Sequence, residues 1–350
     1  MDKDRIKDFA ERVYRDMAGA MAIGMAYLGE KTGLFRALAD GAAVSAAALA
    51  ERTGLVPRYV EEWCAGMAAA GWLEHDEATG SFRLPAEHAF LLASEGTDHF
   101  MGGLFLAGPS LLALAPRLVQ AFREGGGIPP EAFDADWLLA VDLMNGGAYR
   151  ERLASYWLAQ LPEVRARLEA SGRALDVGCG VGEAAMALAR AFPRAAILGV
   201  DPDGRAIGRA RAAATGAGLA NLAFLEGTIE AVPCEPPFDL VLLLDCLHDL
   251  AAPEATLAAI RARLAPEGVL FVMEPRAGDR IADNANPLGV TYYGFSLFHC
   301  TTQSLARGGP GLGTCAGPAR ITELLRRAGF AEVEPLTIKS FTNMFFAARG

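Results

Sequence analysis

Two hydrophobic patterns divide the chain into halves. In the first half apolar residues recur at helical spacing, beginning with Phe9, Val13, Met17, Met21 and Met25, which predicts one stripe of an opening helix. Such a stripe ordinarily packs in a core or a subunit contact, and an adaptable Met-rich binding surface is the alternative. In the second half short apolar runs alternate with Ala- and Arg-rich helical stretches. This alternation is typical of a parallel sheet with helices on both faces.

The second half predicts an α/β fold with seven strands. The strand-like runs cover residues 173–178, 195–201, 221–227, 238–245, 268–275, 332–339 and 343–349. Helical stretches at residues 183–192, 204–216 and 254–264 lie between them. The last two runs follow one another without a helix, so we expect them to pair antiparallel at the sheet edge.

The first half predicts a winged helix. Helices are expected over residues 26–40, 45–54 and 56–74, followed by a tight turn, ATGS, between two short strands. Its third helix could bind DNA, but Arg58 is the only base there, and residues 1–95 carry 10 basic and 15 acidic side chains. We therefore predict a role in dimerisation and in covering the substrate.

Three domains are predicted from these patterns. Residues 1–95 form the winged-helix and dimerisation domain, residues 96–168 a helical bridge and lid, and residues 169–350 the α/β domain. A loop within the bridge is indicated by the glycines at 125–127 and the prolines at 129 and 130.

Composition limits the classes of partner. A hydrophobic content of 52% and a charged content of 21% are typical of a globular protein, and a net charge of -10 argues against a nucleic-acid partner. The amino terminus is charged and unlike a signal peptide, and the uncharged run 100–116 is shorter than the roughly 20 residues of a membrane span. The six cysteines lack zinc-site spacing. We expect a cytoplasmic protein with no membrane contact and no bound metal.

A glycine-rich turn follows the first strand of the α/β half. The segment ALDVGCGVGEAA carries Gly178, Gly180 and Gly182 at a strand-to-helix junction, where a ligand can approach the backbone and helix N–H groups are unpaired. A dinucleotide fingerprint requires a third glycine at position 183, which is Glu183 here. The pattern is instead G-x-G-x-G, preceded by Asp176 within the strand.

Several motifs together resemble the class I S-adenosylmethionine-dependent methyltransferases. They are DVGCGVG, the acidic end of the second strand in GVDPD and the polar end of the fourth strand, and the resemblance covers about residues 145–350. The winged-helix front end and the segment NPLGVTYYGFSLFHCTTQSLARGGPGLGT resemble a bacterial subgroup that methylates small molecules. The resemblance implies a Rossmann-like seven-stranded methyltransferase sheet and S-adenosyl-L-methionine as the cofactor.

The resemblance also implies where the cofactor would lie. The three glycines of the turn would pass close to its methionyl part, and Asp176 would face its ammonium group. Asp201 and Pro202 are both expected cofactor contacts. Asp201 would accept both ribose hydroxyls, although an aspartate there could instead cap the helix after Pro202.

Further cofactor contacts are expected at the ends of the third and fourth strands. Gly227 and Thr228 follow the third strand, where the family often has an acidic residue for adenine, so Glu230 or the backbone would take that role. Asp245 and Cys246 would close the site. Tyr149 would cover the sulfonium, because aromatic faces attract cations.

The fourth strand ends in Leu-His-Asp-Leu, which indicates an acid–base pair. Related O-methyltransferases with a winged-helix front domain have His-Asp in this place, so His248, beside Asp249, is the expected general base. The alternative is that His248 fills the turn and Asp249 makes a turn hydrogen bond. His299 is a second candidate, as an alternative base or as half of a metal pair with His248, but no carboxylate is placed by sequence to complete such a site.

An insertion between Glu274 and Ala319 is too long for a simple connection, so we expect a lid or pocket wall. Its aromatic residues are consistent with a partly apolar acceptor. The predicted substrate contacts are Glu274, Tyr292, Tyr293 and Asn343.

The function predicted from sequence is methylation of a small-molecule acceptor by a homodimer, with oxygen as the expected acceptor atom. One alternative is a transcriptional regulator whose methyltransferase-like half senses a ligand. Another is an enzyme that uses the cofactor differently, for example in its cyclisation.

Overall fold

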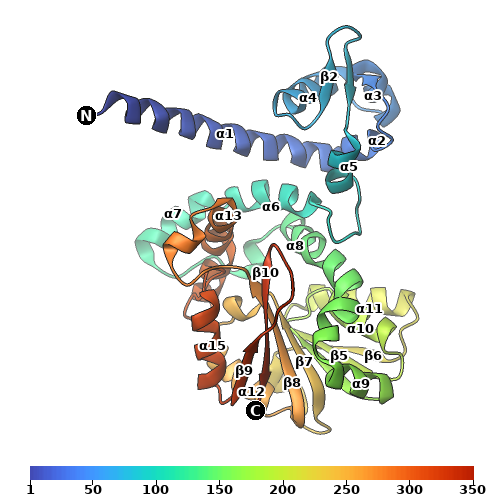
Figure 1. The fold of residues 1–350 in the computed structure, drawn as a ribbon, viewed down its shortest axis with the longest axis vertical. Coiled ribbons are helices and arrows are strands. Elements are labelled where there is room, and N and C mark those ends of the chain that lie inside the picture. Colours follow the sequence, from blue (N-terminus) through green and yellow to red (C-terminus); the bar gives the residue numbers. More distant parts are fainter. The chain divides into compact units, whose positions relative to one another are not determined.

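The computed structural model describes residues 1–350 and divides them into two compact units. Unit 1 contains Met1–Ala113 and Phe133–Gly147, and unit 2 contains Leu114–Ala132 and Ala148–Gly350 (Figure 1). The segment predicted as a bridge, residues 96–168, is therefore divided between the two units.

Unit 1 contains the expected winged helix. Its helices are α1 (Lys3–Thr32), α2 (Leu34–Ala37), α3 (Ala46–Thr53), α4 (Pro57–Ala69), α5 (Ala86–Leu92), α6 (Gly102–Leu112) and most of α8 (Ala135–Ala148). Strands β2 (Glu74–Asp76) and β3 (Ser81–Arg83) form the predicted hairpin, and β1 (Val44–Ser45) pairs with β3 as a third strand.

The helix predicted over residues 26–40 is two helices. Its first part is the end of the long helix α1, which stops because Gly33 adopts a left-handed conformation, φ 75°, and its N–H donates to the carbonyls of Glu30 and Gly29. Helix α2 then begins directly, and Phe35 on it is fully buried against Trp63 of α4, ring centroids 5.3 Å apart. Local helical spacing predicted the elements but not this break.

Unit 2 is built on a seven-stranded sheet in the order β6-β5-β4-β7-β8-β10-β9. The strands are β4 (Arg173–Val177), β5 (Ala196–Asp201), β6 (Leu222–Glu226), β7 (Phe238–Leu244), β8 (Leu264–Pro275), β9 (Glu332–Pro335) and β10 (Asn343–Arg349). Strands β4 to β8 are parallel, and β10 lies antiparallel between β8 and β9. The predicted α/β class and the antiparallel last strand are confirmed. Strand β9 is shorter than the predicted run 332–339 and ends at Pro335, although the Leu336 N–H still donates to the Phe345 carbonyl of β10 at 2.9 Å.

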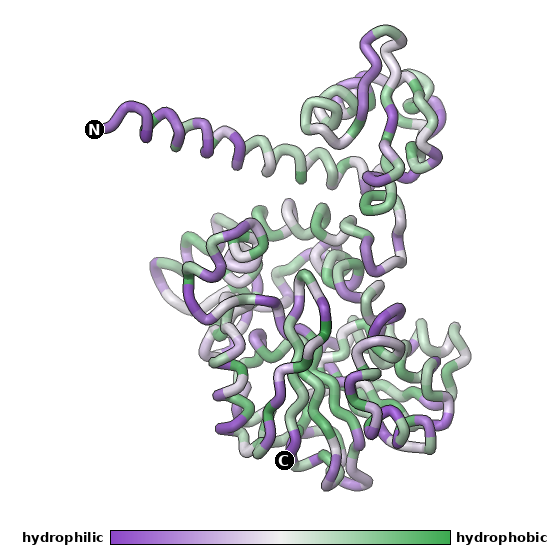
Figure 2. The backbone as a smooth tube through the Cα atoms, viewed as in Figure 1, coloured by the Kyte–Doolittle hydropathy of each residue, from purple (hydrophilic) through white to green (hydrophobic).

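Helices cover both faces of this sheet. Helices α9 (Pro162–Ala170), α10 (Glu183–Ala191) and α11 (Gly204–Gly216) pack on one face, and α12 (Pro253–Arg261) and α15 (Gly317–Arg327) on the other. Alternate residues of a strand enter opposite cores, as Leu242 and Leu243 of β7 do. The central strands are apolar along their length because both of their faces are buried (Figure 2).

The predicted insertion is helical. It contains η6 (Ile281–Asn284), α13 (Pro287–Phe295), the π-helical turn η7 (Ser296–Cys300) and α14 (Thr301–Ala306). The predicted glycine and proline loop, between α7 (Ala115–Glu124) and η1 (Pro130–Ala132), packs on α14, where the Ile128 N–H donates to Thr302 Oγ1 at 2.8 Å. The other elements of this unit are the π-helical segment η2 (Tyr149–Trp157), η3 (Leu158–Gln160), η4 (Ile229–Ala231) and η5 (Leu247–Asp249).

Membrane-spanning length was tested helix by helix. No single helix is long and apolar enough to cross a bilayer, and only α6 and α7 taken together, across a bend of 54°, reach that length and composition.

Two glycines of α1 should respond oppositely to the same substitution. A Cβ on Gly29 would lie 2.7 Å from ring atoms of Phe35 and Trp63, whereas a Cβ on Gly24 meets nothing within 4 Å. We expect Gly29→Ala to lower the free energy of unfolding by about 1–3 kcal/mol through overpacking. Gly24→Ala should raise it by about 0.5–1 kcal/mol, because alanine loses less backbone entropy in a helix. Urea unfolding of the full chain measures both, and effects of equal sign would contradict the packing described for α1.

Candidate active site

The carboxyl ends of the parallel strands bring the predicted residues to one edge of the sheet. The pairings Val177↔Val200, Val177↔Leu243 and Leu244↔Met273 place the ends of β4, β5, β7 and β8 level with one another. Residues that are up to a hundred positions apart in sequence therefore become neighbours. Ligands of open α/β sheets bind outside this edge.

The glycine turn has the left-handed backbone that its sequence requires. Gly178, Gly180 and Gly182 have φ of 70°, 52° and 84°. A Cβ on Gly178 would lie 2.9 Å from Cys246 Sγ, and one on Gly182 would meet the Phe224 ring at 2.5 Å. Protein side chains therefore already occupy the space beside these two glycines. A Cβ on Gly180 meets nothing within 4 Å. Gly180 is therefore the position where a ligand can approach the backbone.

Asp176 lies beneath this turn as a buried acid without a full set of partners. It is 2% exposed, it accepts the backbone N–H of Ala185, and its Oδ2 has no hydrogen-bond partner. Burial raises the pKa of Asp176 to about 7, although the bond from Ala185 opposes the shift. A buried carboxylate oxygen without a partner fits a cationic ligand group such as an ammonium.

Asp201 is tied to the glycine turn at the end of β5. Its Oδ2 accepts the Gly180 N–H at 2.9 Å and its Oδ1 accepts the Asp203 N–H at 2.8 Å, which leaves each oxygen one further acceptor position. Burial raises the pKa of Asp201. The helix after Pro202 is capped by Asp203, whose carboxylate accepts the Arg205 N–H, so the capping alternative for Asp201 is wrong. The geometry suits a pair of ribose hydroxyls.

The end of β6 offers an acid that sequence reasoning missed. Gly227 donates its N–H to the Asp201 carbonyl at 3.0 Å, and Thr228 Oγ1 donates to Glu230 Oε2 at 2.5 Å, so the Thr228 hydroxyl is already engaged. Glu226 pairs with Asp201 in the β5–β6 register, and its carboxylate lies over Gly204. The alternation of β6 could have shown it, because an exposed acid ends a half-buried strand.

The end of β7 carries two closely packed residues. The Asp245 N–H donates to the Met273 carbonyl at 2.7 Å, and Asp245 has φ of 56°. The Cys246 thiol donates to the Val177 carbonyl at 3.4 Å and fills the space beside Gly178. Cys246 therefore supports the glycine turn from below.

His248 forms a buried pair with Glu274 of the neighbouring strand. Nδ1 of His248 lies 2.7 Å from Glu274 Oε2, and the other oxygen, Oε1, accepts the Leu247 N–H at 3.0 Å. The two side chains are 3% and 1% exposed. Burial lowers the pKa of His248, but the carboxylates of Glu274 and Asp249 outweigh it and raise that pKa well above the usual value. Burial raises the pKa of Glu274, and His248 opposes this.

Asp249 connects this pair to the helical insertion. Its Oδ1 is 3.5 Å from His248 Nε2 and its Oδ2 is 3.9 Å from His299 Nδ1. Cys300, which sequence reasoning missed, has its Sγ 3.5 Å from His299 Nδ1. Burial lowers the pKa of His299 to about 4, so that this imidazole is neutral at pH 7. Asp249 is the carboxylate between the two histidines that the sequence alone did not place. Ligand atoms of His248, Asp249 and Cys300 lie within 4.8 Å of one another. The absence of a metal stays a prediction.

Two tyrosines stand over the strand ends. Tyr149 begins the π-helical segment η2, and burial, followed by Asp245 and Asp176, raises its pKa well above the usual value. Tyr292 of α13 is 9% exposed, and burial and then Asp245 raise its pKa. Its hydroxyl donates to the Thr342 carbonyl. Both π-helical segments of the chain, η2 and η7, thus carry residues of this site, a position in which such segments are frequent.

The two other predicted substrate contacts, Tyr293 and Asn343, differ in their distance from this cluster. Tyr293 is 41% exposed and its hydroxyl accepts a hydrogen bond from Asn284 at 3.4 Å, so the structure does not bring it to the cluster. Asn343 begins β10 opposite Pro275, next to Glu274, and its Oδ1 accepts the Thr342 hydroxyl at 2.7 Å.

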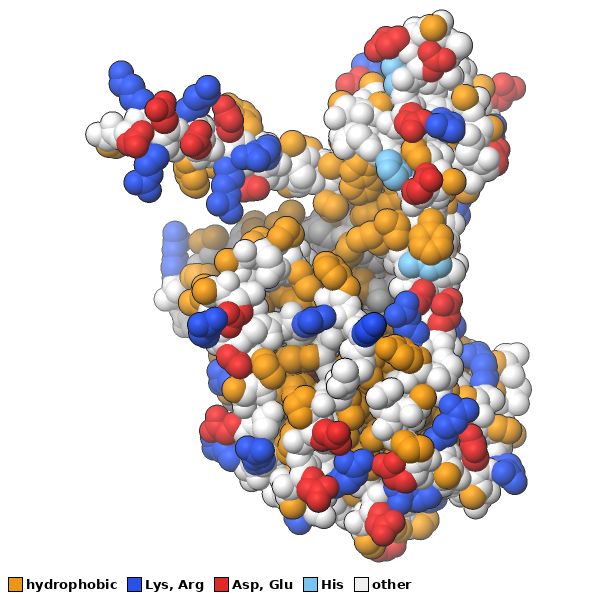
Figure 3. All heavy atoms as spheres, in the orientation of Figure 1, with side chains coloured by type: hydrophobic (Ala, Val, Ile, Leu, Met, Phe, Trp, Pro, Cys, Tyr) orange, Lys and Arg blue, Asp and Glu red, His pale blue; other side chains and the backbone are white.

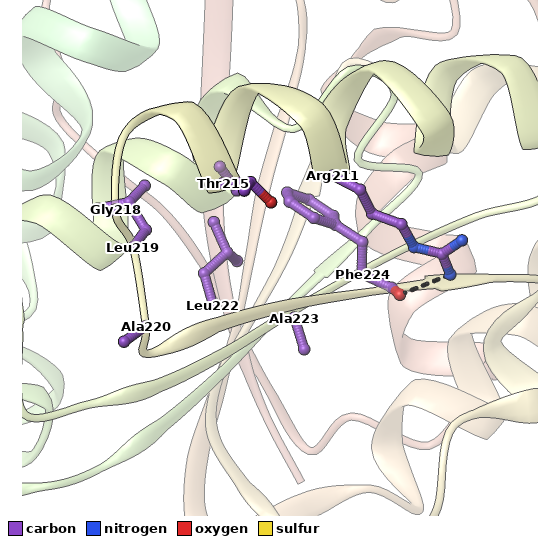
Figure 4. A pocket seen from close by; sticks show the side chains of 9 residues that line it. Arg211, Thr215, Gly218, Leu219, Ala220, Leu222, Ala223 and Phe224 are labelled. Carbon is purple, nitrogen blue, oxygen red and sulfur yellow. Dashed lines mark hydrogen bonds between the residues drawn. The ribbon is translucent and has the colours of Figure 1, made fainter.

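The surface pockets do not coincide with this site. One is a groove between α11 and β6, where Arg211 donates to the Phe224 carbonyl at 2.9 Å (Figure 4). Another lies at the start of α15 and is lined by Asp279, Leu312, Cys315, Ala316, Ala319, Arg320 and Glu323. The site is located instead by its buried polar atoms without partners and by the open face of Gly180.

Comparison with known proteins identifies two families. The family described as a methyltransferase domain matches residues 149–334, and the Rv2258c-like winged HTH domain matches residues 12–94. Two curated relatives are trans-aconitate 2-methyltransferases. The protein from Methylobacterium nodulans is 33% identical over 40% of this chain and 50% of its own length, and that from Deinococcus radiodurans is 31% identical over 47% and 60%. The chain thus spans about half the length of these relatives.

Solved structures share the whole fold. A putative O-methyltransferase from Nostoc punctiforme has a TM-score of 0.72 at 21% identity and covers 100% of this chain and 99% of its own. Human N-acetylserotonin methyltransferase in complex with SAM has a TM-score of 0.67 at 21% identity, covering 97% and 98%. The PigF protein with SAH has a TM-score of 0.70 at 22% identity, covering 97% and 99%.

Asp176 should make cofactor binding depend on pH. Its folded pKa, about 7, is above the unfolded value of 3.8, so its contribution to the stability of the unliganded chain is present at low pH and is lost as pH rises through 7. We expect S-adenosylhomocysteine, which carries an ammonium group, to bind more tightly as pH rises from 6 to 8.

Asp176→Asn should remove this pH dependence, weaken binding by about tenfold or more, and raise the thermal midpoint of the unliganded chain at pH 8. Calorimetry and thermal unfolding measure these effects. The same change at Asp239, which accepts the Arg173 N–H at the other end of the sheet, is the control and should leave binding unaltered. Affinity that is equal at pH 6 and pH 8 in the wild type would contradict the role of Asp176.

Proposed function

We propose that this chain, which belongs to the family of S-adenosylmethionine-dependent methyltransferases, methylates an oxygen atom of a small-molecule acceptor. The observation that carries the proposal is the buried His248–Glu274 pair, which stands beside the glycine turn at the same edge of the sheet.

The residues at this edge fit the cofactor. Gly180 has open space above its backbone, Asp201 has acceptor positions for hydroxyl groups, and Asp176 has a buried oxygen without a partner. The cofactor supplies a methyl group on a positively charged sulfur. Asp176 would hold its ammonium group and Asp201 its ribose.

His248 would act as the general base. Glu274 binds Nδ1, which leaves Nε2, 3.5 Å from Asp249 Oδ1, as the nitrogen that would accept the proton of the acceptor hydroxyl. His248 must be neutral to do this. Its pKa is raised in the unliganded chain, so a cation beside it would promote loss of its proton. Because the pair is buried, little water competes with the acceptor for hydrogen bonds to His248. The imidazole and the acceptor hydroxyl can therefore be held in a reactive position.

Oxygen is favoured as the acceptor atom because the site supplies a base. An amine that arrives unprotonated needs none, and a carboxylate needs none either; the curated relatives are named for trans-aconitate, a carboxylic acid. The presence of a base, His248, together with the carboxylates that orient it therefore favours a hydroxyl group as the acceptor.

The charges on the third helix of the winged helix favour a structural role for this domain over DNA binding. Arg58 of α4 is paired with Glu62 and lies 3.8 Å from Glu61, so its charge is matched within the helix.

We extend the proposal to a homodimer held through α1. Apolar side chains on α1 stay exposed among charged ones (Figure 3): Phe9 is 66%, Val13 50%, Met17 56% and Met21 59% exposed. The apolar stripe on α1 of a second copy of this chain would match it in shape and apolar character.

Substitutions of the buried pair should separate binding from chemistry. We expect His248→Ala to lower turnover by about 10²-fold or more while S-adenosylhomocysteine binds with near wild-type affinity. Glu274→Gln keeps an oxygen for the Leu247 N–H but removes the charge, so the pKa of His248 should fall and the acid limb of the pH–rate profile should move to lower pH. Transfer of labelled methyl groups to the best acceptor from a panel of phenols measures both. Wild-type turnover in His248→Ala would remove this residue from the mechanism, and dialysis against a chelator is the control for a metal.

Charges on the α1 stripe should dissociate the dimer. We expect Met17→Glu together with Met21→Glu to weaken self-association by about 30-fold or more, which is ~2 kcal/mol. Arg15→Glu, also on exposed α1 but away from the stripe, is the matched control and should stay dimeric. Sedimentation velocity measures the three proteins. A wild-type chain that sediments as a monomer would contradict the homodimer.

A further inference from the structure

Four side chains of metal-binding type meet where the turn after β7 faces the helical insertion. His248 and Asp249 belong to η5, and His299 and Cys300 belong to η7. Ligand atoms of His248, Asp249 and Cys300 lie within 4.8 Å of one another, and Cys300 Sγ is 3.5 Å from His299 Nδ1. The proposed methyl transfer gives no role to Cys300 or His299, so the purpose of the whole cluster is still to be explained.

The spacing of these atoms fits a tetrahedral metal ion. Zinc binds nitrogen and oxygen at about 2.0–2.2 Å and sulfur at about 2.3 Å, which places neighbouring ligand atoms roughly 3.3–3.6 Å apart. His248 Nε2 lies 3.5 Å from Asp249 Oδ1, and the Cys300–His299 distance is the same. Asp249 Oδ2 lies 3.9 Å from His299 Nδ1. Small side-chain movements would therefore bring all four residues to one ion.

Glu274 orients His248 as a ligand. A carboxylate only accepts hydrogen bonds, so the Nδ1 N–H of His248 donates to Glu274 Oε2 at 2.7 Å and Nε2 keeps its lone pair. Glu274 is itself fixed by the Leu247 N–H at 3.0 Å. Metal-binding histidines almost always make such a bond through their second nitrogen, and it sets the direction of the first.

A buried oxygen of the cluster has no hydrogen-bond partner. Asp249 Oδ1 is this atom, and it is also the oxygen that lies nearest His248 Nε2. A buried carboxylate oxygen without a donor is costly, and a cation removes that cost. The Asp249 side chain as a whole is 20% exposed and that of His299 is 13% exposed, so the cluster is open to ions from solvent.

The two ligand-bearing elements are held together by other hydrogen bonds. Ser304 Oγ donates to the Leu250 carbonyl at 3.1 Å, and the Gly313 N–H donates to the His248 carbonyl at 3.3 Å. Ligands on a fixed frame lose little conformational freedom when an ion binds. The site is therefore arranged in advance of the metal.

From this arrangement we infer that His248, Asp249, His299 and Cys300 form a zinc site, and that zinc bound there inhibits methyl transfer reversibly. Imidazole, thiolate and carboxylate are the ligands that zinc takes, whereas magnesium and calcium prefer oxygen. On binding, the Cys300 thiol releases its proton to solvent. The metal also takes the Nε2 lone pair of His248, which would otherwise accept the proton of the acceptor hydroxyl. The inhibition rests on the proposed function, and the active enzyme is still expected without a metal.

Zinc binding is measured on the full chain, free of any purification tag and of cofactor. Competition with a chromophoric zinc chelator gives the affinity, and calorimetry in two buffers of different ionisation enthalpy gives the protons released. We expect one zinc ion per chain, bound with micromolar or tighter affinity and with proton release, and no comparable binding of magnesium. Cobalt(II) in the same site should show a thiolate-to-metal charge-transfer band in the ultraviolet.

Cys300→Ser removes the thiolate and nearly keeps the size of the side chain. It should abolish the cobalt band and weaken zinc binding by at least about 100-fold, because loss of even an outer partner of a metal site costs about 10–100-fold. Asp249→Asn should also weaken zinc binding but keep the band at saturating cobalt. Cys234→Ser, which changes an exposed thiol before β7, is the matched control. Thermal midpoints without metal report whether each variant folds.

Inhibition is measured by transfer of labelled methyl groups. Saturating zinc should lower the wild-type rate by about 10²-fold, as loss of the base does, and a chelator should restore it. Relative to its own rate without zinc, Cys300→Ser should need about 100-fold more zinc for the same inhibition.

The outcomes separate the site from the proposed function. No zinc binding in the wild type, or equal affinity in the wild type and Cys300→Ser, overturns the site. Zinc that binds but leaves the rate unchanged overturns the inhibition. Failure of the chain to bind S-adenosylhomocysteine overturns the proposed function and the inhibition with it, and the zinc site is then decided by chelator competition.

Discussion

The hydrogen bond between His248 and Glu274 joins the ends of two central strands and sets the arrangement of the site. Glu274 uses both oxygens, one for the imidazole at 2.7 Å and one for the Leu247 N–H at 3.0 Å, so the turn after β7 is fixed against β8. A carboxylate that is 1% exposed would be costly without these partners. The buried histidine can therefore hold one orientation, and Asp249, one residue further on, lies 3.9 Å from His299 of the helical insertion.

Burial of acids at the strand ends costs stability and prepares the site for cations. Desolvation raises the pKa of Asp176, Asp201 and Glu274, which means that the fold disfavours their charged forms. A chain selected for stability alone would place apolar residues there, as it does along the rest of β4 and β7. A positively charged ligand offsets this cost when it binds. Under the proposed function, the cost of burying these acids and the binding of a cationic cofactor would have one physical source.

The sequence predicted the parts of the site that depend on local pattern. Apolar runs and glycine spacing placed Gly180, Asp201 and His248 at strand ends, because a strand and its following turn are contiguous in the chain. Contacts that depend on register could not be predicted. The partners His248 and Glu274 are 26 residues apart, and their pairing requires knowledge that β7 lies beside β8. The phase of α13 was equally inaccessible, since adjacent residues of a helix point about 100° apart, and Tyr292 faces inward while Tyr293 is exposed.

The two sides of the site are built from different elements, and this explains why similarity of fold does not specify an acceptor. Turns after β4, β5 and β6 carry Gly180, Asp201 and Glu226, whereas the ends of β7 and β8 and the insertion that contains α13 and η7 carry His248, Glu274, Tyr292 and His299. Solved relatives at about 20% identity share the entire architecture. The insertion can change its side chains without disturbing the strand register that positions the glycine turn.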